Sequence, residues 1–149
     1  MDNKYYTPTI DEFYVGFEYE ELSGVDSEME DWSCKSFDPK EYIDRYGEYT
    51  FDDAPLEGWI RVKYLDKEDI ESLGFTHIGG KMLTDVMQEF KWFNGKYWIY
   101  LTYTRFTNFC VLRISTSVED GSVKTLVIHS IGIKNKSELK RLLKQLNLN

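Results

Sequence analysis

The feature that most constrains this chain is a two-residue turn signal. Asn94-Gly95 stands between two runs in which apolar and polar residues alternate, 85–93 and 96–106. Asn-Gly is the strongest short-range signal for a β-hairpin, because both residues tolerate the positive φ angles that a two-residue turn requires. The sequence therefore predicts an antiparallel hairpin closed by these two residues.

The hairpin carries aromatic residues on both faces, although a half-buried strand needs large apolar groups on one face only. With a two-residue turn, Phe90 lies opposite Ile99 on the core face and Lys91 lies opposite Trp98 on the other face. That second face mixes aromatic and charged residues: Glu89, Lys91, Lys96, Trp98 and Tyr100. We expect it to be covered by the N-terminal third, to contact a second copy, or to bind a ligand.

Apolar periodicity elsewhere predicts the remaining elements. Strands are expected at 10–22, 32–37, 59–65, 110–118 and 123–133, and helices at 66–74 and, after Asn135, at the C-terminus. In the last helix Asn135 is the N-cap and Glu138 completes a capping box. The expected fold is α+β: an antiparallel β-sheet of five to seven strands with a C-terminal amphipathic helix packed on one face.

Two strands after the hairpin complete the expected sheet. We place Cys110 and Leu112 on one face together with Val123, Val127 and His129 of the next strand. This face is the core face if the connection before Cys110 holds an even number of residues, and the opposite face if the number is odd.

Charge is distributed unevenly along what we expect to be a single domain, 1–149. Residues 1–57 hold 17 acidic and four basic residues, whereas 58–149 hold nine acidic and 14 basic residues, and the net charge is −8. The acidic third, a strand with long loops, either folds over the hairpin sheet and helix or offers a surface to a basic partner. The candidate partner-binding carboxylates are Glu18, Glu20, Glu28 and Glu30. Mimicry of nucleic-acid phosphates is a variant of this reading; direct nucleic-acid binding is disfavoured by the acidic total.

The sequence contains no motif for zinc binding, phosphate binding or redox chemistry. The two histidines, His77 and His129, match no zinc spacing, and no glycine-rich phosphate loop occurs, so we expect no metal and no cofactor. Cys34 and Cys110 match no redox or metal spacing, which favours free thiols in a reducing cytoplasm. No apolar run is long enough to cross a membrane.

One short pattern is compatible with hydrolysis. Glu89 and Lys91 lie on the same face of a strand, as in metal-dependent nucleases, where such a pair and a second acid hold Mg²⁺ and activate water. Asp66, Asp69 or Asp85 could supply that acid. The same pair is also an ordinary ion pair on a solvated strand.

Three segments carry a resemblance: YYTPTIDEFYVGFEYE, WIRVKYLDKEDIESLGF and IGIKNKSELKRLLKQLNL. They resemble segments of a family of small proteins from Bacteroidetes bacteria and their phages, and together make up about a third of the chain. The resemblance implies a cytoplasmic accessory protein, often phage-borne, and assigns no catalytic residue.

The leading hypothesis is a non-enzymatic binding protein, such as a phage-encoded inhibitor of a host defence system. It would occlude a host protein or sequester a small-molecule ligand through Glu89, Lys91, Trp98 and Tyr100, or through the acidic carboxylates. The alternatives are a metal-dependent hydrolase or nuclease that uses Glu89 and Lys91, and an assembly protein that forms a homodimer through the aromatic face.

Overall fold

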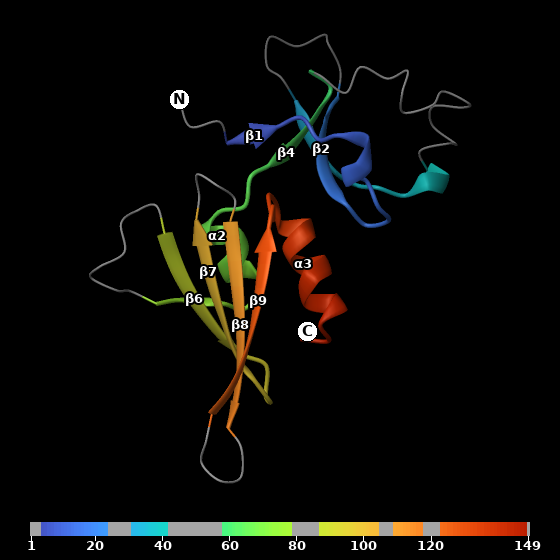
Figure 1. Cartoon of the computed structure of the whole chain (residues 1–149). Helices are drawn as coiled ribbons and strands as arrows, with labels where there is room; N and C mark the ends of the chain where they lie inside the picture. Colours follow the sequence, from blue (N-terminus) through green and yellow to red (C-terminus); the bar gives the residue numbers. More distant parts are fainter. Residues whose placement is uncertain are drawn as a thin grey trace. The chain divides into compact units, whose positions relative to one another are not determined.

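The protein forms two compact units, Met1–Tyr64 and Leu65–Asn149, in a computed structural model (Figure 1). The structure describes residues 4–23, 31–41, 58–78, 87–104, 109–117 and 123–148. All strand pairs in these ranges are antiparallel, and helices accompany them, so the α+β class is confirmed. The strands divide between a four-stranded and a five-stranded sheet instead of forming one sheet.

The first unit is built on the four-stranded sheet, in the order β1-β4-β2-β3. Its elements are β1 (Tyr5–Tyr6), the 3₁₀ helix η1 (Ile10–Glu12), β2 (Glu18–Leu22), β3 (Trp32–Ser36) and β4 (Ile60–Lys63). Its core consists of Phe17, Tyr19, Ile60 and Val62, with Phe13 and Phe37 packed against them. The sequence placed β4 with the hairpin sheet, but β4 pairs with β1 and β2.

The strand predicted over 10–22 begins only at Glu18, so its first half was wrong. Thr9 precedes η1, and its backbone N–H donates to Glu12 Oε1 (3.3 Å), which favours a helical start. Gly16 has a φ of +87°, within a turn in which the Phe17 N–H donates to the Tyr14 carbonyl (2.8 Å). Alternation along 10–17 therefore reflects aromatic side chains that reach the core from a turn.

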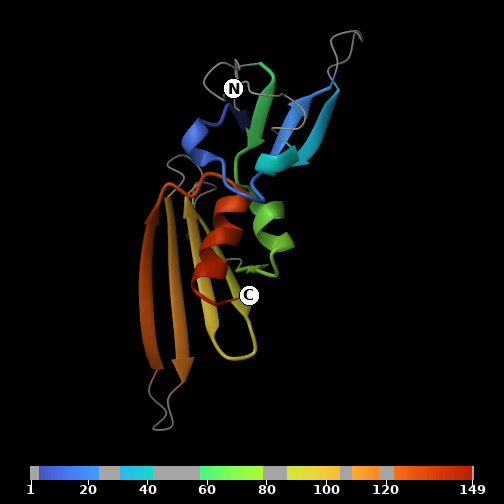
Figure 2. The same ribbon diagram turned by 90° about the vertical axis from the view of Figure 1, so that its right-hand side faces the viewer.

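The second unit is built on the five-stranded sheet, in the order β5-β6-β7-β8-β9. Its elements are α2 (Lys67–Ser72), β5 (Thr76–His77), β6 (Met87–Phe93), β7 (Trp98–Thr104), β8 (Phe109–Ser117), β9 (Val123–Ile131) and α3 (Lys136–Gln145). Both helices lie on one face of the sheet (Figure 2). Buried Ile70, Leu139 and Leu143 of the helices join Phe90 and Leu101 of the sheet in one core cluster. The predicted packing of the C-terminal helix is confirmed.

Polar caps fix where both helices begin. Asp66 accepts a hydrogen bond from the Asp69 N–H (2.9 Å), and Asn135 accepts one from the Glu138 N–H (2.9 Å). Each bond satisfies a backbone donor that the first helical turn leaves without a partner. The Glu138 carboxylate accepts from the Lys134 N–H (2.5 Å), one residue before the cap.

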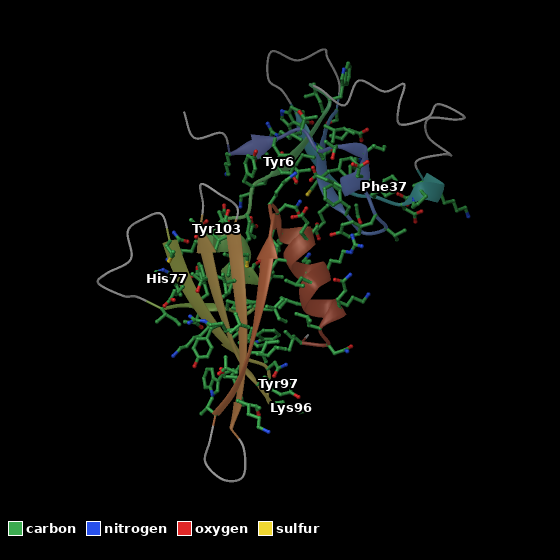
Figure 3. The ribbon with its side chains drawn as sticks, viewed as in Figure 1. Tyr6, Phe37, His77, Lys96, Tyr97 and Tyr103 are labelled. Atoms are coloured by element: carbon green, nitrogen blue, oxygen red, sulfur yellow. The ribbon has the colours of Figure 1, made fainter. Side chains whose placement is uncertain are left out.

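The hairpin forms, but its register differs from the predicted one by two residues. Phe93 pairs with Trp98, so four residues connect the strands instead of two. Asn94 Oδ1 accepts hydrogen bonds from the N–H groups of Lys96 (3.1 Å) and Tyr97 (2.9 Å), which holds these residues in the turn. Figure 3 shows Lys96 and Tyr97 at this end of the sheet. Because side chains alternate with a period of two, a shift of two residues keeps every residue on its predicted face.

The two faces of β9 are exchanged relative to the prediction. Cys110 and Leu112 do share the core face with Leu101, as an even connection requires. However, Cys110 pairs with Ser130 and Val111 pairs with His129. Val127 pairs with Arg113 and is 44% exposed. The placement of Val123, Val127 and His129 beside Cys110 was therefore wrong.

Candidate binding surfaces

The face of the five-stranded sheet that lies opposite α2 and α3 is the main candidate surface, here called the outer face. Its residues include Thr76, Glu89, Lys91, Phe93, Trp98, Tyr100, Thr102, Arg113, Ser115 and Val127. One row crosses all five strands, from Thr76 through Lys91, Tyr100 and Arg113 to Val127. The register therefore gathers residues far apart in sequence into one continuous strip.

Cations and aromatic rings are neighbours on this face. Lys91 Nζ lies 5.8 Å from the centroid of the Trp98 ring, and Arg113 Cζ lies 6.0 Å from that of Tyr100. Such cation–π contacts contribute about 0.5–1 kcal/mol each at exposed sites. Phe93 and Trp98 lie in contact, with ring centroids 4.9 Å apart, and are 48% and 42% exposed. Large apolar rings thus remain accessible next to the strip, on the side of the turn between β6 and β7.

The carboxylate of this face is held by a cation. Glu89 Oε1 lies 3.2 Å from Arg113 Nη2 and also accepts a hydrogen bond from Thr102 Oγ1 (3.4 Å). Arg113 Nε is buried and has no hydrogen-bond acceptor among the described residues, whereas the Arg113 side chain as a whole is 42% exposed. The charges of Glu89 and Arg113 offset each other in this ion pair. The charge of Lys91 therefore makes the centre of the face net positive.

The sequence correctly brought Glu89, Lys91, Trp98 and Tyr100 to one face, although their cross-strand partners differ from those predicted. Lys91 pairs with Tyr100, and Glu89 pairs with Thr102. Sequence reasoning missed Arg113 as a site residue. Arg113 lies between Leu112 and Ile114, so alternation places it on the face opposite these apolar residues. This alternation was the signal that could have identified Arg113, once the core face of the strand was known.

The acidic candidates divide between described and undescribed parts of the chain. Glu28 and Glu30 lie outside the described residues, whereas Glu18 and Glu20 lie on β2. Glu20 Oε2 contacts Arg61 Nε at 2.6 Å. The Arg61 guanidinium in turn stacks between two rings, with its Cζ 4.0 Å from the centroid of Tyr5 and 3.9 Å from that of Trp32. Glu20 is therefore part of a packed ion pair and is not a free carboxylate that could mimic a phosphate.

The buried Cys110 thiol is a poor nucleophile, and the described residues form no metal-binding cluster. Burial raises the pKa of the Cys110 thiol to about 12, which keeps the thiol protonated and unreactive at neutral pH. Within the described ranges, no three His, Cys, Asp or Glu side chains gather in a way that could hold a metal ion. Asp66 caps α2, on the helix side of the sheet, and Asp85 lies outside the described residues.

A cavity of about 390 Å³ lies on the helix side of β8 and β9, next to the end of α3. It is lined mainly by Tyr97, Ile114, Lys124, Leu126, Leu146 and Leu148. The sequence did not predict it, because its lining comes from two strands, from the turn before β7 and from the segment at the end of α3.

None of the described helices is long and apolar enough to cross a membrane. Comparison of the chain with protein-family models, with curated proteins and with solved structures found no match.

Proposed function

We propose that this protein is a non-enzymatic binding protein that occludes a protein partner through its outer face. The observation that carries the proposal is the group of rings and cations on the outer face, Trp98, Tyr100, Lys91 and Arg113, of which Trp98 is 42% exposed. Aromatic residues and arginine are the types most enriched at the energetic centres of protein interfaces. The inhibitor of a host defence system expected from the phage resemblance is one form of this function.

The chemistry of the strip defines the partner. Lys91 and the partly exposed side chain of Arg113 favour an acidic group, and the rings of Phe93 and Trp98 favour an apolar or aromatic group next to it. The strip runs across an open sheet face, whereas small-molecule sites are concave and enclose most of their ligand. These features support an acidic, partly apolar protein surface as the partner.

Hydrolysis is supported less well by the same residues. A divalent metal at Glu89 would compete with Arg113 for the carboxylate, and the described neighbours of Glu89 add no second acid. The ion pair between Glu89 and Arg113 instead orders the guanidinium on the sheet, where it stays available to a partner.

The proposal is tested by comparing binding to matched variants. Tagged wild-type protein captures partners from a lysate of a Bacteroidetes bacterium, and a captured protein is identified, purified and titrated by calorimetry. We expect Trp98→Ala to weaken binding at least about tenfold, as for a central interface residue. Lys91→Glu should weaken it as well and reduce its dependence on salt.

Trp59→Ala is the matched control, because Trp59 is exposed to a similar degree, 47%, but lies outside the outer face. Its affinity should equal that of the wild type. Equal affinity of Trp98→Ala and wild type would reject the outer face as the binding surface. Capture of only a nucleic acid or a small molecule would reject a protein partner.

A further inference from the structure

Strand β9 forms a long, open edge of the five-stranded sheet. Among the strands that the structure describes it pairs with β8 alone, and in Figure 1 it lies at one end of the row of labelled strands, next to β8. Among the described residues, its backbone makes no hydrogen bond besides those to β8. One row of N–H and C=O groups along nine residues is therefore available to another strand.

This edge lacks most of the features by which proteins protect an open strand. It contains no proline, and its nine pairs with β8 run without a bulge. By contrast, the opposite edge strand, β5, has only two residues. Lys124 is the one charged residue of β9, which leaves the edge with little defence against pairing.

Apolar side chains are exposed on both faces of β9. Val123 and Val127 are 64% and 44% exposed on the outer face, and Leu126 is 60% exposed on the helix side. A strand that covers this edge must supply apolar groups on both of its own faces. Strand β9 has this pattern itself, so a second copy is a complementary partner.

We infer that two copies of this chain associate by antiparallel pairing of their β9 strands. A two-fold axis through Val127 pairs all nine residues, with position 126 opposite 128 and Lys124 opposite Ser130, so that no like charges meet. The two sheets then form one continuous sheet of ten strands, within the usual limit for open sheets. This inference does not depend on the proposed function, because it uses an edge and not the outer face.

The helix side of the pair would gain apolar burial. Leu126 lines the cavity together with Leu146 and Leu148 from the segment at the end of α3. In the paired arrangement, Leu126 of one copy lies beside Ile128 of the other, and its exposed surface is removed from water. A two-fold axis normal to the sheet keeps both α3 helices on the same face.

Light scattering coupled to size-exclusion chromatography tests the inference. We expect a mass of twice 17.7 kDa for the wild type, falling to the monomer mass in Leu126→Lys and remaining dimeric in Val15→Lys. Val15 is 73% exposed in a turn of the first unit, so its replacement controls for an added charge. Amide exchange in residues 123–131 should slow as the protein is concentrated, because dimerisation adds backbone hydrogen bonds there.

Each other outcome overturns the inference. A wild-type monomer at all concentrations excludes the pairing. A protein that remains dimeric in Leu126→Lys does not use the β9 edge. The same holds if Val15→Lys dissociates the dimer as completely as Leu126→Lys does. A dimer lost in Trp98→Ala but kept in Leu126→Lys uses the outer face instead. Circular dichroism of each variant shows whether a change from the dimer mass to the monomer mass results from unfolding of the variant.

Discussion

Cys110 and Cys34 differ in their surroundings, and this difference is testable. Cys110 is fully buried in the core of the second unit, and desolvation raises its pKa to about 12, whereas Cys34 is an exposed free thiol. Because the thiolate is the reactive form, we predict that an alkylating reagent labels only Cys34 in the folded protein. Mass spectrometry should find one label per folded chain and two labels after unfolding in urea.

The variant Cys34→Ser should take no label while folded, and labelling of its Cys110 would contradict the burial of Cys110.

The raised pKa of Cys110 also sets the sign of a pH effect on stability. Above the ordinary pKa of 9.0, the unfolded chain releases the Cys110 proton while the folded chain keeps it. This residue therefore lowers the free energy of unfolding as the pH rises from 9.0 towards about 12.

At the scale of elements, the turn between β6 and β7 depends on one side chain. Asn94 Oδ1 accepts two backbone hydrogen bonds, and its Nδ2 donates to the Leu148 carbonyl (3.1 Å) beyond α3. We predict that Asn94→Ala lowers the free energy of unfolding by about 3 kcal/mol, since it removes three hydrogen bonds and each contributes roughly 1 kcal/mol. Asn94→Asp keeps the acceptor and loses only the bond to Leu148, so it should cost about a third as much. Urea unfolding that shows equal losses in both variants would contradict this role.

The same turn shows which information the sequence contains. Alternation with a period of two assigned Phe90, Lys91, Trp98 and Ile99 to their correct faces, because a register error of two residues leaves faces unchanged. The length of the turn depends on which backbone N–H groups donate to the Asn94 side chain. The sequence alone does not predict these donors.

Strand β9 shows the opposite case. Leu126 and Ile128 alternate with Val123 and Val127, so apolar residues occupy both faces and the pattern permits two registers. The correct register depends on whether the preceding connection has an odd or an even number of residues. An apolar pattern on both faces is ambiguous for prediction, and it is also the feature that makes this edge suitable for pairing with a second copy.

At the scale of the whole molecule, composition indicated an acidic and a basic part but placed their boundary at 57/58. The structural boundary follows Tyr64, because Ile60 and Val62 of β4 belong to the core of the first unit. Charge is a property of the surface, whereas a unit is defined by which apolar residues share a core. Sequence periodicity revealed β4 as a strand, but its partners are distant in sequence and left no local signal.

The core of the second unit suggests that this unit folds alone. All 13 buried members of its cluster lie between Leu65 and Leu148, and Tyr103 Oη donates a hydrogen bond to the Leu65 carbonyl (2.9 Å) at the start of the unit. Domains of this size form sufficient cores without disulfides or metals. We predict that residues 65–149, expressed without the first unit, give dispersed amide resonances and a cooperative urea transition.

The control for this fragment is Leu101→Asp, which places a carboxylate in the fully buried centre of the cluster. That variant should collapse the amide dispersion, because a buried charge without a partner costs several kcal/mol, a large fraction of the stability of a small domain. Poor dispersion in the unsubstituted fragment would show that the first unit is required for this core to form. Good dispersion would allow the outer face and the β9 edge to be tested on the fragment, free of the acidic residues 1–57.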